Sequence, residues 1–234
     1  MGGLDQLTAV ILAGGLGTRF RSVTQDRPKV LAEIRGRPFT TYLLDQLIDA
    51  GLVHVVLCTG YLGEQVWEMI GETYGPLGLE YSHESTPRGT GGALRLALPL
   101  IKSEIAVVMN GDSFCEIDLK AVLSWHLEKK AETTLLLSEV DDTTRYGLVD
   151  VDSGGRVTGF SEKGENTGPG WINAGIYVFQ RHILLDIPEG RAVSLEREIF
   201  PGLIGKGLHG YCHRGRFLDI GTPESYALAG DFFK

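Results

Sequence analysis

The first half of the chain alternates apolar runs with segments in which apolar residues recur at helical spacing. The run Val53–Thr59 is largely apolar, which is typical of a strand buried in a parallel sheet. Strands are expected at Thr8–Leu12, Val53–Thr59, Leu79–His83 and Ile105–Met109, and helices at Pro38–Ala50, Leu62–Tyr74, Thr90–Ile101 and from an Asp118 cap to about Lys130. This alternation predicts a parallel sheet with helices on both faces, and Trp67, at an apolar helical position, is expected in the core.

The second half of the chain is richer in strands. Ser153-Gly154-Gly155 separates two alternating segments and predicts a hairpin turn. Strands are expected at Thr133–Val140, Gly147–Asp152, Arg156–Ser161, Trp171–Phe179, Leu208–Cys212 and Phe217–Ile220. Helices are expected at Ser194–Leu203, where Ser194 can serve as an N-cap, and from Pro223 to the end of the chain. The pattern shows no linker or repeat and favours one α/β domain over residues 1–234.

Composition narrows the class of protein. The net charge of −8 disfavours a nucleic-acid binder. No apolar run could span a bilayer, and the N-terminal residues do not resemble a secretory signal. Three widely spaced cysteines argue against a disulfide framework or a zinc ribbon, so a cytoplasmic location is expected. If such an acidic chain binds an anionic ligand, it must concentrate positive charge or backbone N–H groups locally.

The loop after the first predicted strand meets this requirement. Ala13-Gly14-Gly15-Leu16-Gly17-Thr18 exposes backbone N–H groups that could approach a phosphate, and Arg19, Arg21, Arg27 and Lys29 follow it. It is not a Walker A loop, and Phe20 stands where the dinucleotide fingerprint needs glycine. The glycines alone are equally compatible with a tight turn, but a solvated basic turn does not explain why the cations adjoin them.

A series of motifs resembles the signature of the sugar-1-phosphate nucleotidylyltransferases. They are Leu12–Arg19 with Pro28-Lys29, Gly89–Ala93, Asn110–Asp112, Phe160–Lys163, Asn173–Tyr177 and Asp219–Pro223, and they cover nearly the whole chain in the family's order. The resemblance implies a Rossmann-like three-layer α/β/α fold with a mixed, mostly parallel central sheet, the nucleotide-diphospho-sugar transferase fold. It also implies transfer of a nucleoside monophosphate from an NTP to a sugar 1-phosphate, with release of pyrophosphate. Residues 1–130 would then form the nucleotide-binding half and residues 131–234 the sugar-phosphate half.

Two aspartates are the candidate metal ligands. Asp112 follows a buried strand at its carboxyl end, where ligands bind in open α/β sheets. Asp219 lies within an apolar run, where an unpaired charge would be costly. By the resemblance, the two share a Mg²⁺ ion, which suits an in-line displacement between two anions. Taken alone, Asp112 in an Asn-Gly-Asp turn could equally be a simple loop residue.

The resemblance assigns the remaining roles. The catalytic cations would be Arg19, Lys29 and Lys163. The nucleotide would contact Leu12, Ala13, Gly14, Gly15, Gly17, Thr18, Glu84, Gly89, Thr90 and Gly91. The sugar would contact Gly111, Tyr146, Gly147, Glu162, Asn173 and Glu196. Without the resemblance, Glu162-Lys163 would be read as an exposed strand end.

The choice of base depends on Glu84. In thymidylyl members of the family a glutamine aligns with this position. A carboxylate accepts hydrogen bonds and donates none, which matches the adjacent N1–H and N2–H₂ donors of guanine better than it matches uracil or thymine. GTP is therefore the predicted nucleotide, although Glu84 could instead be a surface residue that touches no base.

The acceptor is less determined by the sequence. Arg145-Tyr146-Gly147 and Ser194-Leu195-Glu196 resemble the guanylyltransferases that act on D-glycero-α-D-manno-heptose 1-phosphate, whose products feed surface polysaccharide synthesis. Mannose-1-phosphate guanylyltransferases and N-acetylmuramate-1-phosphate uridylyltransferases are the alternatives. We expect no β-helix acyltransferase domain, no nucleic-acid or membrane partner, and a possible homo-oligomer.

Two competing functions have their own sequence features. A glycosyltransferase would need a D-x-D metal motif, which Asp150-Val151-Asp152 matches, but strand alternation beside the predicted turn puts both carboxylates on a solvated face. A non-catalytic nucleotide-sugar sensor could keep the glycine loop and lose a catalytic group. The presence of Arg19, Lys29, Asp112, Lys163 and Asp219 favours an enzyme.

Overall fold

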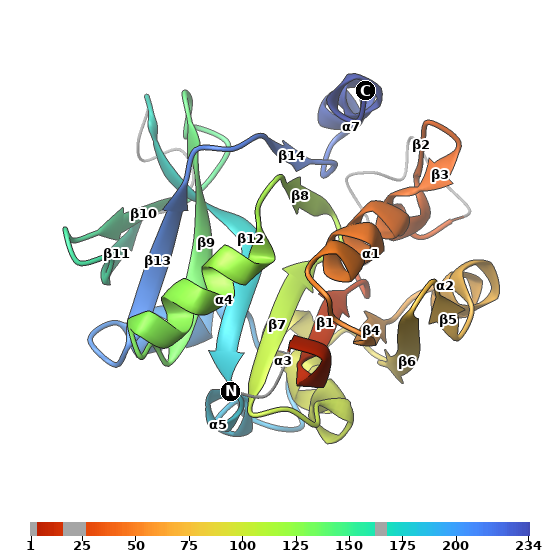
Figure 1. Cartoon of the computed structure of the whole chain (residues 1–234), viewed down its shortest axis with the longest axis horizontal. Coiled ribbons are helices and arrows are strands. Elements are labelled where there is room, and N and C mark those ends of the chain that lie inside the picture. Colours follow the sequence, from red (N-terminus) through yellow and green to blue (C-terminus); the bar gives the residue numbers. More distant parts are fainter. Residues whose placement is uncertain (1–3, 16–26, 162–167) are drawn as a thin grey trace.

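The structure is a computed structural model that describes residues 4–15, 27–161 and 168–234. Its centre is a sheet in which four parallel strands lie side by side in the order β7-β1-β4-β6 (Figure 1). These strands are β1 (Thr8–Leu12), β4 (His54–Thr59), β6 (Leu77–His83) and β7 (Ile105–Asn110). The short strand β5 (Thr73–Tyr74) pairs with β6 in the antiparallel direction. The carboxyl ends of the parallel strands therefore share one edge of the sheet.

Side chains alternate between two hydrophobic clusters along each parallel strand, as pleating requires. In β1, for example, Ala9 and Ile11 face one cluster and Val10 faces the other. The first cluster lies against α1 (Phe39–Asp49), α2 (Gly63–Ile70), α4 (Leu119–Glu128) and α7 (Pro223–Phe232). The second lies against α3 (Gly89–Ala97), α5 (Arg181–Leu185) and α6 (Phe200–Leu203). The three-layer α/β/α fold predicted from the sequence is confirmed.

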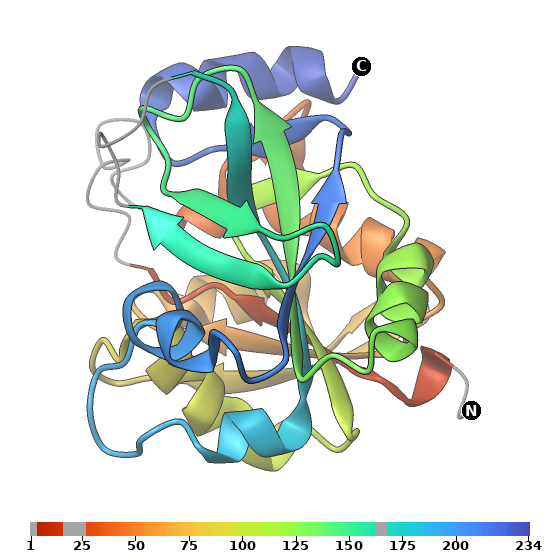
Figure 2. The same ribbon diagram turned by 90° about the vertical axis from the view of Figure 1, so that its left-hand side faces the viewer.

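The strand-rich half extends the same sheet. The long strand β12 (Gly170–Gln180) pairs antiparallel with β7 and with β9 (Thr133–Val140), and β13 (Leu208–His213) pairs parallel with β9. The hairpin of β10 (Leu148–Val151) and β11 (Val157–Ser161) stands beside β12 (Figure 2). Pairing of β12 with β9 is irregular between Asn173 and Tyr177, where Gly175 has φ of +78°. The sheet is thus mixed, with its parallel strands next to β12.

Two further two-stranded sheets complete the fold. One joins β2 (Glu33–Ile34) to β3 (Arg37–Pro38), and the other joins β8 (Ser113–Cys115) to β14 (Phe217–Asp219). The end of the chain supports the second sheet, because the Phe233 ring stacks on Tyr42 and makes an edge contact with Phe114. Helix α7 begins at a Thr222 cap, with Pro223 in its first turn as the sequence predicts.

Several predicted boundaries differ from the structure. The predicted helix Leu62–Tyr74 ends at Ile70, because Gly71 adopts φ of +80° and residues Thr73–Tyr74 then form β5. Trp67 was expected in the core but is 50% exposed on α2. Helix α3 tightens into a 3₁₀ turn over Leu98–Leu100, which contains Pro99. In the described part of the chain, no helix is both long and apolar enough to cross a membrane.

Candidate active site

Several of the predicted site residues follow the carboxyl ends of the parallel strands. Asp112 follows β7, Gly14 and Gly15 follow β1, and Glu84 follows β6. Strands β1 and β4 separate β7 from β6, so the outer strand ends lie about 14 Å apart at the usual strand spacing. An extended ligand can therefore lie across this edge with one end at Glu84 and the other at Asp112.

Lys29 and Asp112 form an ion pair at one end of this edge. The Lys29 Nζ atom lies 2.7 Å from Asp112 Oδ2, and the side chains are 12% and 46% exposed. The backbone holds them together: Gly111 N donates to Leu12 O, and a Cβ on Gly111 would lie only 2.8 Å from Val30 Cγ1. Gly111 thus allows the segment with Lys29 to pack against the turn with Asp112, which gives it a structural role beside the predicted sugar contact.

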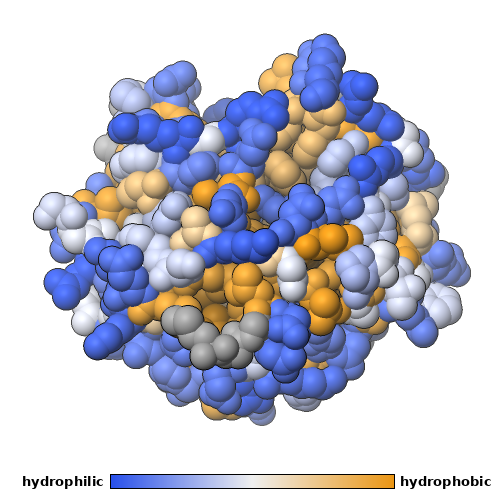
Figure 3. All heavy atoms as spheres, viewed as in Figure 1, coloured by the Kyte–Doolittle hydropathy of each residue, from blue (hydrophilic) through white to orange (hydrophobic). Residues whose placement is uncertain are grey.

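The small sheet of β8 and β14 brings the second aspartate to the first. Asp219 pairs with Ser113, and Ile220 N donates to Asp112 O at 2.9 Å. Asp219 Oδ1 accepts from Gly221 N at 2.6 Å, and a side chain on Gly221 would collide with this carboxylate. Figure 3 shows the surface notched between α7 and the strand tips above β14. The backbones of the Asp112 and Asp219 segments are therefore joined, and both residues are partly exposed.

This pair of aspartates fits a magnesium ion by its donor chemistry. Mg²⁺ prefers hard oxygen ligands and is often held by one or two carboxylates together with substrate phosphates and water. Among the residues that the structure describes, no cluster contains three or more His, Cys, Asp or Glu side chains suited to a metal. Among the described residues the candidate ligands are therefore the two aspartates, and substrates and water would supply further ligands.

Glu84 occupies the other end of the edge in a constrained setting. Its residue is 9% exposed, Oε2 accepts from Arg88 N at 3.0 Å, and Glu84 N donates to Thr59 O. Burial raises the pKa of its carboxyl group, and the hydrogen bond from Arg88 N opposes this increase. Glu84 is therefore not the surface side chain that the sequence left as an alternative.

Glycines make room for the Glu84 carboxylate. A Cβ on Gly14 or on Gly60 would lie 3.0 Å from Glu84 Oε1, whereas a Cβ on Gly15 would meet nothing within 4 Å. Gly60 also approaches Gly14 O closely. The structure thus explains Gly14 by the approach of Glu84, while no described atom lies within 4 Å of a Cβ on Gly15.

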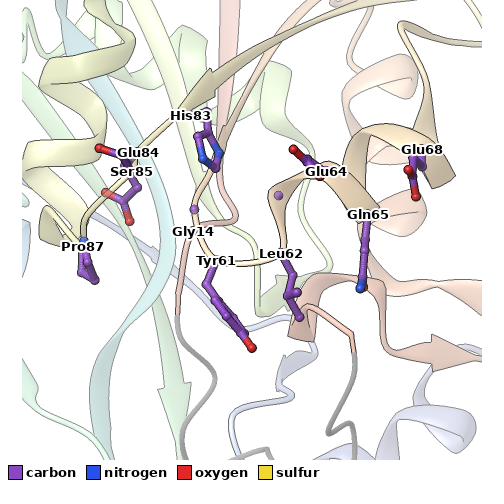
Figure 4. Close-up of a pocket in the computed structure, with 12 residues that line it drawn as sticks. Gly14, Tyr61, Leu62, Glu64, Gln65, Glu68, His83, Glu84, Ser85 and Pro87 are labelled. Atoms are coloured by element: carbon purple, nitrogen blue, oxygen red, sulfur yellow. The ribbon is translucent and has the colours of Figure 1, made fainter.

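A cavity of about 480 Å³ adjoins Glu84 (Figure 4). Its lining comes from the ends of β1, β4 and β6 and from the start of α2, and includes Gly14, Tyr61, Leu62, Gln65, Glu84 and Pro87. Leu62 has φ of +58°, an uncommon conformation for a bulky residue, where the chain turns from β4 into α2. This volume falls in the range of small-molecule sites.

Two predicted sugar-side residues, Asn173 and Glu196, lie near a buried tyrosine, Tyr177, to which the motifs assigned no role. Asn173 Nδ2 donates to Tyr177 Oη at 3.0 Å, and Asn173 Oδ1 accepts from Gly175 N at 2.9 Å. Burial raises the pKa of Tyr177, and the charge of Glu196 raises it further, so Glu196 lies near the phenol. The sequence could not predict this contact. In a regular strand, Asn173 and Tyr177 would be separated along the strand axis, whereas the pairing of β12 with β9 is irregular between these two residues.

Tyr146 and Gly147 lie beside the hairpin and the second aspartate. Burial raises the pKa of Tyr146, and the charge of Asp219 adds to this shift. A Cβ on Gly147 would lie 3.0 Å from Ser161 O. Gly17, Thr18, Arg19, Glu162 and Lys163 lie outside the described residues.

The start of α3 carries the other predicted nucleotide contacts, Gly89, Thr90 and Gly91. Gly89 has φ of +69°, and a Cβ there would lie 2.5 Å from Val193 O. Gly91 N donates to Val193 O at 2.9 Å. Both glycines therefore have a packing reason within the protein, and their contact with a nucleotide remains a prediction. Leu12 and Ala13 end β1 at the same edge, and Ala13 N donates to Cys58 O.

The D-x-D sequence is a solvated turn, as the alternation predicts. Asp150 and Asp152 are exposed, and Asp152 Oδ1 accepts from Gly154 N and Arg156 N. These two hydrogen bonds use the carboxylate to hold the hairpin turn. The structure therefore gives the glycosyltransferase alternative no support.

Comparison with known proteins identifies the family of this chain. The family described as nucleotidyl transferase matches residues 8–234. The mannose-1-phosphate guanylyltransferase of Mycobacterium tuberculosis is 40% identical over 226 residues, covering 94% of this chain and 63% of that protein. The D-glycero-alpha-D-manno-heptose 1-phosphate guanylyltransferase of Aneurinibacillus thermoaerophilus is 35% identical, covering 95% of this chain and 96% of that protein.

A solved structure is similar over the same extent. HddC from Yersinia pseudotuberculosis, crystallised with GMP-PN, superposes with a TM-score of 0.86 at 34% identity and covers 97% of this chain and 100% of that one. The chain spans a little under two thirds of the mycobacterial relative and nearly all of the heptose-specific one. The resemblance expected from the motifs is confirmed, and the chain belongs to the nucleotidyl transferase family.

Proposed function

We propose that this protein is a sugar-1-phosphate guanylyltransferase that transfers GMP from GTP to a sugar 1-phosphate and releases pyrophosphate. The observation that carries the proposal is the arrangement of one sheet edge, with the buried Glu84 carboxylate at one end and the Lys29–Asp112 pair beside Asp219 at the other. The relatives are named as guanylyltransferases, and HddC was crystallised with GMP-PN.

Glu84 is the proposed reader of guanine. Its buried carboxylate has one backbone donor, Arg88 N on Oε2, and lies beside the cavity. A base that brings two adjacent N–H donors supplies hydrogen bonds that a buried carboxylate needs. Guanine does so through N1–H and N2–H₂, whereas uracil would set a carbonyl oxygen against the carboxylate. Gly14 and Pro87 line the same cavity and would form walls around the base, and Gly15 follows Gly14 after the end of β1.

The proposed reaction is an in-line displacement at the α-phosphorus of GTP. A phosphate oxygen of the sugar 1-phosphate forms the new P–O bond, and the bond to the departing pyrophosphate breaks. The attacking oxygen is already anionic, so the protein's task is orientation and charge neutralisation rather than proton removal. Lys29 would exchange its contact with Asp112 for phosphate oxygens. Arg19 and Lys163 would act on the triphosphate and on the sugar phosphate, respectively.

Asp112 and Asp219 would hold the magnesium ion, whose contribution when bound is to polarise phosphoryl oxygens and offset the developing charge. Asn173, Glu196, Tyr146 and Gly147 would contact the sugar, together with Gly111 and Glu162.

We also propose a single domain over residues 1–234, because each hydrophobic cluster contains residues from both halves of the chain.

The proposed acceptor is D-glycero-α-D-manno-heptose 1-phosphate. The match that covers nearly the full length of both chains is to the enzyme named for this sugar. Mannose 1-phosphate is the second candidate, because the relative named for it has the higher identity, 40% against 35%. A cytoplasmic location would suit such biosynthesis.

A substrate matrix tests the proposal directly. Purified protein is incubated with Mg²⁺, each of GTP, ATP, UTP, CTP and dTTP, and each of several sugar 1-phosphates, and pyrophosphate release is measured. Release that requires both substrates, and is fastest with GTP, is the expected result. Faster turnover with UTP or dTTP would remove the role of Glu84. Release without an acceptor, or no release with any pair, would contradict the transferase assignment and favour a hydrolase or a sensor.

A further inference from the structure

The first turn of α3 and the segment 191–196 lie together although about 100 residues separate them in the sequence. Val193 N donates to Arg88 O at 2.8 Å, and Val193 O accepts from Gly91 N at 2.9 Å. The absence of side chains at Gly89 and Gly91 permits this approach. Two segments assigned to different substrates, the base side and the sugar side, are therefore joined backbone to backbone.

The Thr90 hydroxyl lies at the centre of this junction. It donates to Glu196 Oε2 at 2.9 Å and accepts from Leu195 N at 2.9 Å. A hydroxyl has a single hydrogen to donate. While these bonds hold, the Thr90 hydroxyl cannot donate to a nucleotide, so a contribution of this hydroxyl proton to the reaction would pass through Glu196.

Glu196 is held on one oxygen. Ser194 Oγ also donates to Oε2, at 2.9 Å, and among the described residues no hydrogen bond reaches Oε1. Glu196 is the second residue of a π-helical turn over Leu195–Ile199, in which Phe200 N donates to Leu195 O. Glu198, two residues further on, accepts a hydrogen bond from Ser194 N. Such turns are rare and often occur at functional sites. Because Thr90 and Ser194 both donate to Oε2, Oε1 can accept a hydrogen bond from a ligand, for example from a sugar hydroxyl.

We propose that Thr90 is a positioning residue whose hydroxyl orients the Glu196 carboxylate toward the hydroxyl groups of the sugar 1-phosphate. The inference rests on the proposed function, because it takes the sugar as the ligand of Glu196. Although Thr90 lies in the first turn of α3 on the nucleotide side, its hydroxyl is then expected to affect binding of the sugar 1-phosphate and not to contact GTP directly.

The test compares Thr90→Val, which keeps the shape and removes the hydroxyl, with Thr90→Ser, which keeps the hydroxyl. Pyrophosphate release is measured with the sugar 1-phosphate varied at saturating GTP, and with GTP varied at saturating acceptor. T90V should raise the KM for the sugar 1-phosphate about tenfold, the scale of a lost hydrogen bond to a charged group, and change the KM for GTP less than about twofold. T90S should recover most of the affinity. Thr73→Val, the same change on an exposed strand, serves as the control.

A double variant separates positioning from general packing. If Thr90 acts through Glu196, then T90V combined with Glu196→Leu should be no worse than Glu196→Leu alone. Additive losses, an equal rise in the KM for GTP, or no effect of T90V would overturn the inference.

A crystal structure of T90V provides a readout that does not depend on activity. The Glu196 carboxylate should leave its place beside residue 90 while the 193–195 backbone stays in position. An unmoved Glu196 would overturn the positioning role even if turnover changed. Absence of transfer by the wild-type protein would instead contradict the proposed function, while this structure would still decide whether Thr90 holds Glu196.

Discussion

The base pocket around Glu84 and the phosphate edge around Asp112 end the same sheet, but their carboxylates are held in different ways. Glu84 is 9% exposed, has no described salt bridge, and its pKa is raised by burial. The Asp112 side chain is 46% exposed and pairs with Lys29. A buried carboxylate needs donors of fixed geometry, which favours selectivity, whereas an exposed pair can exchange partners as phosphates arrive. The carboxylate proposed to select the base is therefore buried, whereas the carboxylate proposed to act in phosphate chemistry is partly exposed and paired with a cation.

The largest expected effect is at the phosphate edge. Asp112→Ala and Asp219→Ala should each lower kcat by roughly 10²- to 10³-fold, the scale seen when a group that stabilises transition-state charge is removed. Both variants should remain folded, because Asp112 and Asp219 are both partly exposed. Pyrophosphate release and thermal unfolding measure the two quantities. Asp150→Ala, at the solvated turn, is the matched control, and near-normal turnover of either site variant would contradict the metal assignment.

The next effect concerns the cation of the same pair. Lys29→Met should lower kcat by about 10²-fold, because no other described cation is paired with Asp112, and the change removes charge beside the α-phosphorus. Lys102→Met, at the opposite edge of the sheet beside Glu80, is the control for the loss of one positive charge. Equal rates for the two variants would show that Lys29 only balances Asp112.

At the base pocket the expected loss is smaller and depends on the nucleotide. Glu84→Gln should reduce kcat/KM for GTP by about 10- to 100-fold, corresponding to a lost hydrogen bond to a charged acceptor. Rates with UTP and dTTP should change much less or increase, because an amide can also donate. Competition between GTP and UTP measures this ratio. If all nucleotides lose rate equally, Glu84 supports the fold rather than reading the base.

The smallest expected effect is a pH dependence of stability and of GTP affinity that arises from the buried Glu84 carboxylate. Because the pKa of Glu84 is raised in the folded protein, its contribution to the free energy of unfolding is present at low pH and lost as the pH rises through that raised value. Affinity for GTP should move in the opposite direction and improve as the carboxylate ionises. Thermal unfolding and the KM for GTP, each measured across the acidic range, should lose these slopes in the Glu84→Gln variant. Unchanged slopes would assign them to other groups.

Hydrophobic periodicity predicted helices and strands correctly where local sequence preference decides the structure. Strand β9 has its predicted bounds, Thr133–Val140, and Asp118 caps α4 with its side chain as expected. It failed where tertiary contacts competed with local preference. The helical pattern through Leu62–Tyr74 gave way to β5, because these residues pair with the edge of β6, and Trp67 lies on the outer face of α2.

The candidate site shows the same division. The motifs predicted Asp112, Asp219, Lys29 and Glu84 as chemical types, but neither spacing nor composition could reveal that Lys29 contacts Asp112 or that Gly14 makes room for Glu84. Two contacts could not be predicted from the sequence. The hydrogen bond from Asn173 to Tyr177 spans an irregular strand pairing, and the hydrogen bond from Thr90 to Glu196 reaches a residue in a π turn.

The sequence by itself determined the family, the alternation that produces a parallel sheet, and the residue types available for phosphate chemistry, because these follow from local periodicity and from motifs read in order. The tertiary structure alone decided which of those residues meet. Parallel pairing brings the ends of β1, β4, β6 and β7 to one edge, and the pairing of β8 with β14 brings Asp219 to Asp112 across more than 100 residues of chain. Contacts of that kind depend on long-range packing, for which no local pattern carries the information.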